Sequence, residues 1–348
     1  MNNYINACAL NTSAETLFLD HISPLASLLK IPLIVTNKEN AQLTAKYYPE
    51  VKVRYWPDLE FRLHELAEEF DALIECNYWE PHLKQLFRLR FKKEMRLIFC
   101  PHGQSDKGFL APSLAPYALQ ETILLYGNLM KEMLQELKIW DKISSHAQVG
   151  NFRLNYYEGH KARLFRCAQE EIFSLLSPSN HTLLYAPTWN DDDRATSFFA
   201  YGKKLIQELP NDWNLIIKVH PLLVSYHPHL FYPLSSFAEK QRNCIITSQF
   251  PPIYPLLDKI DAYLGDYSSI GYDLLIFQKP MFFLEQSHLS PMRLHSCGKI
   301  LDPSKNLFQS IEKGIAEADG FRPLQAALYK KAFAPVENIQ KTLFEALK

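Results

Sequence analysis

The sequence predicts an α/β fold built from two Rossmann-like domains. Its 348 residues suffice for two domains of ordinary size, each with its own core. Short apolar or β-branched runs alternate with longer amphipathic runs, which is typical of βαβ units and of parallel sheets covered on both faces. The alternation pauses at a long polar helix and then resumes. We therefore expect an N-terminal domain (residues 1–152), a connecting segment (153–180), a C-terminal domain (181–322) and C-terminal helices (323–348).

The elements follow from the period of the apolar residues. In the N-terminal domain the expected strands are residues 31–36, 51–55, 72–75, 96–100 and 122–126, and the expected helices are residues 39–48, 59–70, 82–93 and 128–143. A helix over residues 155–176 connects the domains. In the C-terminal domain the expected strands are residues 182–185, 215–219, 244–247, 262–264 and 281–284, and the expected helices are residues 197–209, 235–241 and 253–257, before a helical C-terminus interrupted at Pro335.

Composition excludes several classes of protein. The net charge of -1 gives no bulk attraction for nucleic acid, whose binders usually carry a basic excess. The six cysteines form no CxxC pair and no cluster at zinc spacing, so we expect a reduced chain without a structural metal or cofactor. No apolar run approaches the ~20 residues that span a bilayer, and no secretion signal is present, so we expect a cytoplasmic protein, either free or at the inner face of the cell membrane. The P-loop, GxGxxG and GxSxG motifs are all absent.

Polar segments follow four of the expected strands. They are residues 101–108, residues 185–193, the pair His220-Pro221 and residues 266–269 (DYSS). Ligands of parallel sheets bind at the carboxyl ends of the strands, near the switch in strand order. We therefore expect all four segments to face a central cleft between two lobes, which is the GT-B architecture.

The DYSS segment lies where a strand turns into a helix. Ser268 and Ser269 stand where the first turn exposes its amide hydrogens, so amides, helix dipole and hydroxyls together favour a bound phosphate. The alternative is that one serine only caps the helix. Asp266 precedes them in the same turn.

A histidine-glycine loop follows the strand at residues 96–100. An imidazole is the side chain suited to act as a general base near neutral pH, so His102 can take a proton from a hydroxyl, and Lys107 can steady a phosphate or an acidic acceptor. Gly103 and Ser105 belong to the same loop, and glycine is rare in this chain, so Gly103 indicates a sharp turn or a close approach to a ligand. A turn histidine beside a solvated lysine is the alternative.

His220 ends another strand. Pro221 holds the residue before it in an extended conformation, and Lys218 lies on the same face of the strand if the strand is regular. Both side chains suit a diphosphate oxygen or a leaving phosphate, whereas a satisfied core histidine is the alternative.

The segment after residues 182–185 offers weaker candidates. Thr188 and Asn190 can donate to a ligand, and Trp189 either shapes a pocket wall or packs in the core. Residues 191–193 are three consecutive aspartates, whose side chains point in different directions, so a metal site is disfavoured although a divalent ion is not excluded.

Residues 83–99 combine basic and large apolar side chains. The basic ones run from Lys84 to Arg96. They fit contact with an anionic membrane face or a polyanionic acceptor, and equally a solvated helix face.

Taken together, these segments resemble the CDP-glycerol glycerophosphotransferase family, which makes teichoic-acid-like polymers. The resemblance rests on His102-Gly103, residues 185–189 (YAPTW), His220-Pro221 and residues 266–269, in that order. It covers about half of the chain and implies a GT-B fold with the donor nucleotide in the C-terminal lobe and the acceptor in the N-terminal lobe. It further implies that His102 is the base, that His220 contacts the donor diphosphate, and that Ser268 and Ser269 hold donor phosphate.

The expected function is phosphoryl transfer from a CDP-linked polyol phosphate to a hydroxyl of a polymer or lipid-linked acceptor, with CMP as the leaving group. Two alternatives remain open: a GT-B glycosyltransferase or sugar-nucleotide epimerase that uses UDP- or CMP-sugars, and a non-catalytic nucleotide-binding scaffold.

Overall fold

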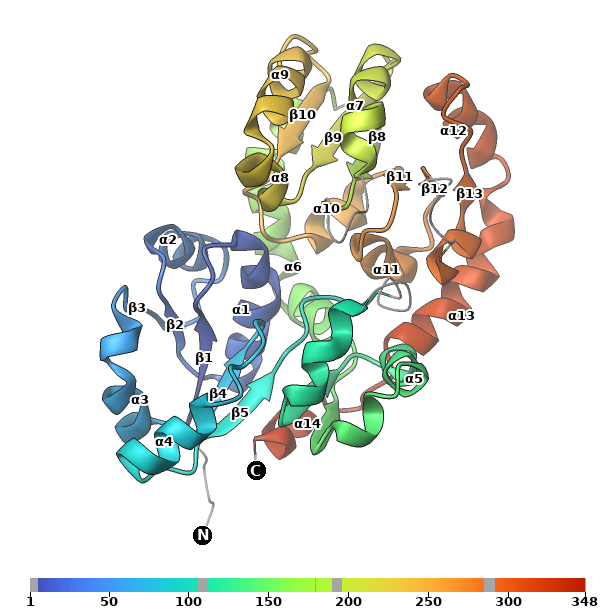
Figure 1. Cartoon of the computed structure of the whole chain (residues 1–348). Helices are drawn as coiled ribbons and strands as arrows, with labels where there is room; N and C mark the ends of the chain where they lie inside the picture. Colours follow the sequence, from blue (N-terminus) through green and yellow to red (C-terminus); the bar gives the residue numbers. More distant parts are fainter. Residues whose placement is uncertain (1–5, 106–111, 179, 190–195, 285–291, 348) are drawn as a thin grey trace. The chain divides into compact units, whose positions relative to one another are not determined.

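The computed structural model describes residues 6–105, 112–178, 180–189, 196–284 and 292–347. They form two compact units, each built on its own sheet (Figure 1). Unit 1 contains the described residues of the ranges 1–104, 111–159 and 331–348. Unit 2 contains Ser105 and the described residues of the range 160–330. Among these residues every strand pairing is parallel, so the expected α/β class with two Rossmann-like sheets is confirmed.

Unit 1 holds a seven-stranded sheet in the order β3-β2-β1-β4-β5-β6-β7. Its strands are β1 (Ala7–Asn11), β2 (Leu33–Val35), β3 (Val53–Tyr55), β4 (Ala72–Glu75), β5 (Arg96–Phe99), β6 (Thr122–Leu125) and β7 (Ser145–Gln148). Its helices are α1 (Leu19–Leu29), α2 (Lys38–Tyr47), α3 (Leu63–Glu69), α4 (Leu83–Phe91), α5 (Asn128–Glu136) and α14 (Ile339–Ala346). All residues of β1 and β4 are buried, as expected for central parallel strands covered on both faces.

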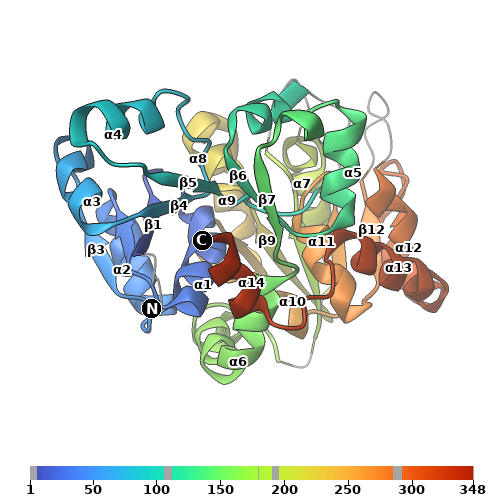
Figure 2. The ribbon, with the colours of Figure 1, turned by 90° about the horizontal axis from the view of Figure 1, so that it is seen from below.

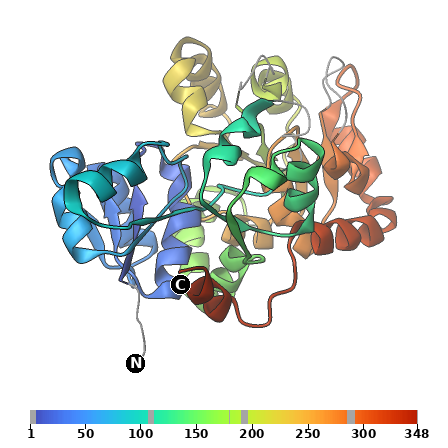
Figure 3. The same cartoon turned by 60° about the horizontal axis from the view of Figure 1, so that its bottom comes forward.

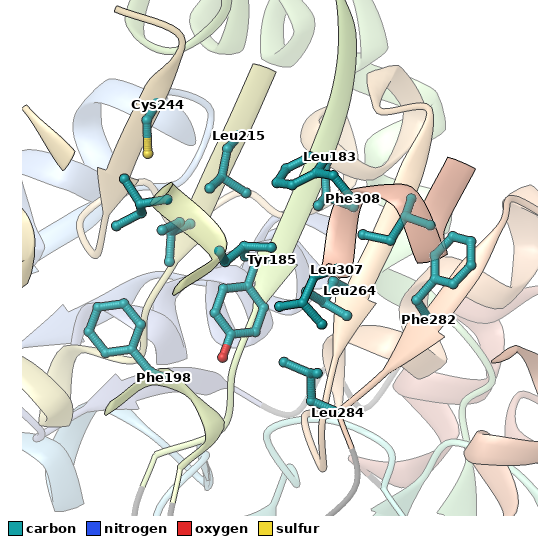
Figure 4. Close-up of a cluster of buried hydrophobic side chains, with 14 of the residues drawn as sticks. Leu183, Tyr185, Phe198, Leu215, Cys244, Leu264, Phe282, Leu284, Leu307 and Phe308 are labelled. Atoms are coloured by element: carbon teal, nitrogen blue, oxygen red, sulfur yellow. The ribbon is translucent and has the colours of Figure 1, made fainter. Parts of the chain in front are cut away.

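Unit 2 holds a six-stranded sheet in the order β10-β9-β8-β11-β12-β13. Its strands are β8 (His181–Ala186), β9 (Trp213–Lys218), β10 (Cys244–Thr247), β11 (Ala262–Gly265), β12 (Met281–Phe283) and β13 (Lys299–Ile300). Its helices are α7 (Ser197–Gln207), α8 (Pro221–Tyr226), α9 (Pro228–Ala238), α10 (Tyr254–Lys259), α11 (Ile270–Leu274) and α12 (Leu307–Ile315). Figure 4 shows Leu215, Tyr185 and Leu264 of three neighbouring strands packed with Phe198 of α7 and Phe308 of α12.

The connecting and C-terminal segments are divided differently from the expectation. The boundary between the units falls inside α6 (Phe152–Glu171), next to His160, whose φ of −126° and ψ of 16° are not helical. Residues 153–180 are thus shared between the units. Helix α13 (Arg322–Ala332) belongs mostly to unit 2, whereas α14 lies beside α1 in unit 1, where Gln340 donates to the carbonyl of Leu28 at 3.2 Å (Figures 2 and 3).

Some elements had no clear sequence signal. Strand β1 is rich in small residues, and α1 contains Pro24, so neither matched a strand or helix pattern. Strand β7 (SHAQ) is polar because it lies at the edge of its sheet. Helices α8 and α12 were also missed, and α9 begins well before the expected residue 235.

Candidate functional site

Unit 2 brings three of the predicted segments to one edge of its sheet. Thr188 follows β8, His220 follows β9, and residues 266–269 follow β11. Strands β8 and β11 are neighbours, although β9 and β10 lie between them in the sequence, so the strand order switches there. Such a switch point is where open α/β sheets bind ligands.

Asp266 ties the two loops at the switch point together. Its carboxylate is fully buried; Oδ1 accepts from the amides of Thr188 at 2.7 Å and Tyr267 at 2.6 Å. Oδ2 accepts from the amide of Ser197 at 3.2 Å and from its hydroxyl at 2.6 Å. Burial raises the pKa of Asp266, and these four hydrogen bonds oppose that rise. Since both oxygens are used within unit 2, Asp266 orders the turn rather than presenting an oxygen to a ligand.

The two serines begin α11, as the sequence indicated. Ser268 is 9% exposed, and its Oγ accepts from the amide of Ile270 at 3.4 Å. Ser269 occupies the N-cap position with helical φ and ψ, and its side chain makes no capping hydrogen bond. Capping alone therefore does not account for Ser269. The interpretation as a phosphate site remains a prediction.

His220 is both the last residue before α8 and its N-cap. Its backbone is extended, with φ −70° and ψ 136°, as Pro221 predicted. Nδ1 accepts from the amide of Leu222 at 3.2 Å, so the neutral ring carries its proton on Nε2 and can donate there. The ring stacks on Trp189, with centroids 5.7 Å apart and an interplanar angle of 27°. This contact links the loop after β9 to the loop after β8.

The remaining candidates of unit 2 are less informative. Lys218 is the half-buried last residue of β9, paired in register with Thr247. Thr188 is 5% exposed, and its amide is committed to Asp266. Asn190 and the aspartates 191–193 lie outside the described residues.

His295, which the sequence did not single out, contacts the backbone of the DYSS segment. It is 3% exposed, and its Nε2 lies 2.9 Å from the backbone oxygen of Asp266. Nδ1 accepts from the amide of Met292 at 3.4 Å, so Nε2 carries the proton and donates to that oxygen. The ring also packs on Phe283, with centroids 4.8 Å apart. The two partners are separated by 29 residues, and no local pattern signals their contact.

In unit 1, the loop after β5 exposes His102. Its ring meets Phe18 edge-on, with centroids 4.9 Å apart. Gly103 has a φ of 117°, a conformation that favours glycine and confirms the sharp turn that the sequence indicated. Ser105 is half-buried, and Lys107 lies outside the described residues. The predicted role of His102 as a base is compatible with its exposure.

A buried histidine holds this loop in place. His21 of α1 is 6% exposed, and its Nδ1 lies 3.1 Å from the hydroxyl of Tyr126, which donates to the carbonyl of Pro101 at 2.9 Å. The proton of the neutral ring therefore lies on Nδ1. Burial, reinforced by the charges of Arg153 and His102, lowers the pKa of His21 well below 6.5. A neutral side chain thus fixes the residue before His102.

The buried His21 makes stability depend on pH. In the unfolded chain His21 takes up a proton below about pH 6.5, but in the folded chain it stays neutral. The free energy of unfolding should therefore fall as the pH drops below that value, by up to about 1.4 kcal/mol per pH unit from this group. We expect His21→Gln to lose less stability than the wild type between about pH 7 and about pH 5.5 in urea unfolding. Equal losses would contradict this assignment, because all other histidines are shared by the two proteins.

The basic stretch, residues 83–99, forms α4, the turn after it and β5. Several of its charges have partners in unit 1: Lys84 with Glu121 at 2.5 Å, Lys93 with Asp71 at 2.5 Å, Arg88 with Glu94 at 3.2 Å, and Arg96 with the carbonyl of Leu347 at 3.2 Å. Leu89 is 62% exposed on the same helix. Part of the positive charge is therefore compensated.

The described part of the chain lacks both a membrane span and a metal-ligand cluster. Within it, no helix is both long and apolar enough to cross a membrane. Among the same residues, no three histidine, cysteine, aspartate or glutamate side chains gather in a way that could hold a metal ion.

Comparisons of sequence identify related proteins. Residues 169–288 match the family model described as CDP-Glycerol:Poly(glycerophosphate) glycerophosphotransferase. The teichoic acid poly(glycerol phosphate) polymerase of Bacillus subtilis is 29% identical over 130 residues, which cover 33% of this chain and 16% of that protein. The enzyme of the same name from Staphylococcus epidermidis is 23% identical over 246 residues, covering 62% of this chain and 32% of that protein. The matches thus span a third or less of these relatives.

Comparisons of structure agree on the fold. The wall teichoic acid polymerase TagF has a TM-score of 0.68 at 13% identity, covering 98% of this chain and 87% of that one. The UDP-GlcNAc 2-epimerase of Neisseria meningitidis has a TM-score of 0.60 at 14% identity, covering 98% of each chain. These similarities establish a GT-B-like fold. The matched region 169–288 contains three of the four family-like segments, so this part of the chain is similar to the CDP-glycerol glycerophosphotransferase family.

Proposed function

We propose that this protein transfers a polyol phosphate, with glycerol phosphate as the first candidate, from a CDP-linked donor to a hydroxyl of a cell-surface polymer or glycolipid. The observation that carries the proposal is the convergence of Thr188, His220 and Ser268 at the switch point of the unit 2 sheet, inside the region that matches the family model. The ends of β8, β9 and β11 supply the hydrogen-bond donors that a bound diphosphate requires.

On the donor side, unit 2 supplies hydrogen-bond donors and positive charge. Nε2 of His220, the hydroxyls of Ser268 and Ser269 and the ammonium group of Lys218 are the groups suited to the diphosphate. The acceptor oxygen attacks the distal phosphorus, the bond to the bridging oxygen breaks, and CMP leaves with the electron pair. Catalysis then rests mainly on positioning and on donors aimed at the leaving phosphate.

On the acceptor side, unit 1 supplies the base. The exposed imidazole of His102 takes the proton of the attacking hydroxyl, while Gly103 gives the loop its turn. Ser105 and Lys107 are the neighbouring groups that we assign to acceptor or phosphate binding. No resident cofactor enters the proposal, and running the reaction with and without EDTA tests whether a divalent ion accompanies the donor.

Donor binding is tested by thermal shift and calorimetry with CDP-glycerol. Binding to the native state should raise the melting temperature at concentrations well above Kd. We expect His220→Asn, which retains an N-cap acceptor for Leu222, and Ser268→Ala to weaken binding by about ten- to a hundredfold, the value of a hydrogen bond to a charged group. The matched controls His229→Ala and Ser236→Ala, both exposed on α9, should bind normally. Unchanged affinity for CDP-glycerol in both test variants would contradict the assignment of a phosphate site to these residues.

Two other functions are separated by the same experiment. The epimerase-like fold keeps a UDP-sugar reaction as the second candidate. Stabilisation by UDP-sugars or CMP-sugars but not by CDP-glycerol or CDP-ribitol would favour it. Stabilisation by CDP-glycerol without release of CMP in the presence of acceptor would instead indicate a nucleotide-binding scaffold.

We also assign the peripheral membrane contact to α4. Arg90 and Lys92 are exposed, next to the apolar Leu89. Each basic residue near an anionic surface contributes roughly 1 kcal/mol, so reversing both charges with Arg90→Glu and Lys92→Glu should lower partitioning into phosphatidylglycerol vesicles by about thirtyfold or more. Lys38→Glu with Lys52→Glu, at two exposed sites of unit 1 outside α4, is the matched control. Equal cosedimentation of both double variants would leave α4 as a solvated helix.

A further inference from the structure

Unit 1 contains a cavity of its own at the switch point of its sheet. The cavity has a volume of about 560 Å³, within the usual range for small-molecule sites. Strands β1 and β4 are neighbours there, although β2 and β3 lie between them in the sequence. Polar residues that line it include Thr12, directly after β1, Glu75, the last residue of β4, and Asn77, two residues later. The cavity thus occupies the place in unit 1 that the DYSS segment occupies in unit 2.

Glu75 bridges the two strand ends with one oxygen only. The residue is 5% exposed, and its Oε1 accepts from the amide of Thr12 at 3.1 Å, from the Thr12 hydroxyl and from Nδ2 of Asn77 at 3.4 Å. Among the described residues no group donates to Oε2. Burial raises the pKa of this carboxyl. In unit 2, Asp266 also connects two strand ends, but both of its carboxylate oxygens accept hydrogen bonds. Glu75 differs because its second oxygen can still accept a hydrogen bond from a ligand.

The charge of the lining selects against anions. Its charged members are Glu75, Glu60 and Glu80, and neither lysine nor arginine is among the described residues that line the cavity. Tyr78, which is 39% exposed, and Trp79 add aromatic surface. A phosphate would meet three carboxylates there, whereas a neutral ligand with several hydroxyls would find acceptors and apolar ring faces.

The cavity lies next to the His102 loop. Strand β5, which leads into that loop, pairs with β4, and the amide of Cys100 donates to the backbone oxygen of Glu75 at 2.8 Å. The segment that starts at Thr12, which lines the cavity, ends at Phe18, whose ring contacts His102. Adjacent strands are ~4.8 Å apart, so the cavity at the end of β4 and the loop that carries His102 follow neighbouring strands of the unit 1 sheet.

We propose that this cavity binds the neutral, hydroxyl-rich part of the acceptor, a sugar ring or an uncharged polyol segment, with Oε2 of Glu75 accepting from one of its hydroxyls. The role as acceptor rests on the proposed function, but the binding of a polyhydroxyl ligand does not. The charged, phosphate-bearing parts of the acceptor remain outside the cavity.

Saturation-transfer difference NMR on the full chain tests the binding directly. The probes are methyl β-glucoside, N-acetylglucosamine and ribitol, with glycerol 3-phosphate and choline as charged comparisons. We expect signals from at least one neutral probe, and none from glycerol 3-phosphate. Glu75→Gln keeps the bonds of Oε1 but places an NH₂ group at Oε2, and should weaken the neutral probe by about tenfold or more. Glu68→Gln, at an exposed site of α3 outside the cavity, is the matched control.

Two further measurements keep the result decisive. If Glu75→Gln fails to fold, Tyr78→Ala at the exposed rim should weaken the same probe. In the transfer assay, Glu75→Gln should raise the KM for the acceptor and leave the Kd for CDP-glycerol unchanged. Neutral-probe binding that depends on Glu75 upholds the cavity site even if no transfer occurs with any donor, a result that would refute only the proposed function. Absence of every neutral-probe signal, or signals from choline alone, overturns the cavity proposal, and a wild-type acceptor KM in Glu75→Gln overturns the acceptor role of the cavity.

Discussion

Replacement of His102 by alanine is expected to lower the transfer rate by about 10²- to 10⁴-fold, the usual contribution of a general base. His102 is the exposed imidazole at the turn that Gly103 makes possible, and the chain from His21 through Tyr126 to Pro101 fixes the residue before it. An imidazole titrates near neutrality, so it can take the proton of an acceptor hydroxyl. The rate constant should be measured as CMP release at saturating CDP-glycerol.

The same variant should bind CDP-glycerol normally, because the side chains that we assign to the diphosphate of the donor all belong to unit 2. Calorimetry with CDP-glycerol checks this separately from the rate. His82→Ala, an exposed histidine of unit 1 before α4, is the matched control and should keep both properties. Normal turnover in His102→Ala would refute the base assignment, and a loss of donor affinity equal to the loss of rate would place His102 in the donor site instead.

Replacement of Asp266 by alanine is expected to destabilise unit 2 by about 3 kcal/mol or more, since several amides and a hydroxyl lose a charged acceptor in the interior. For a unit of this size that loss corresponds to a fall in melting temperature of roughly 6 °C or more. Differential scanning calorimetry measures it. Donor affinity should fall with it, because the loops that carry Thr188 and Ser268 lose their common anchor.

The control for this prediction is Asp212→Ala, an exposed aspartate in unit 2, which should melt like the wild type. Asp266→Asn is informative because either orientation of the amide turns an NH₂ group toward backbone donors, so it should rescue little of the lost stability. Wild-type melting of Asp266→Ala would contradict the anchoring role.

Local chemistry made part of this protein predictable. The alternation of apolar runs predicted most strands of both sheets and the parallel class, because buried parallel strands are apolar on both faces. Residues with restricted backbones were informative as well. Pro221 predicted the extended conformation of His220, and Gly103 predicted the turn that its φ of 117° makes. The order of the four polar segments was sufficient to identify the family resemblance.

Contacts between residues far apart in the sequence were not predictable in this way. The Glu75 carboxylate meets Thr12 across 63 residues, and Asp266 meets Thr188 across 78 residues. Each pair forms because the strand order places two distant strands side by side, and strand order leaves no periodic trace in the sequence. The return of α14 to unit 1 and the support of Asp266 by His295 have the same origin.

The sequence by itself determined the α/β class, the family-like segments and the residues expected to carry the chemistry. The tertiary structure alone decided that Asp266 anchors loops, that His220 caps α8, and that Glu75 lines a cavity with its Oε1 bonded to Thr12. The physical reason is that a side chain's role depends on which of its atoms are already hydrogen-bonded, and those partners come from other strands.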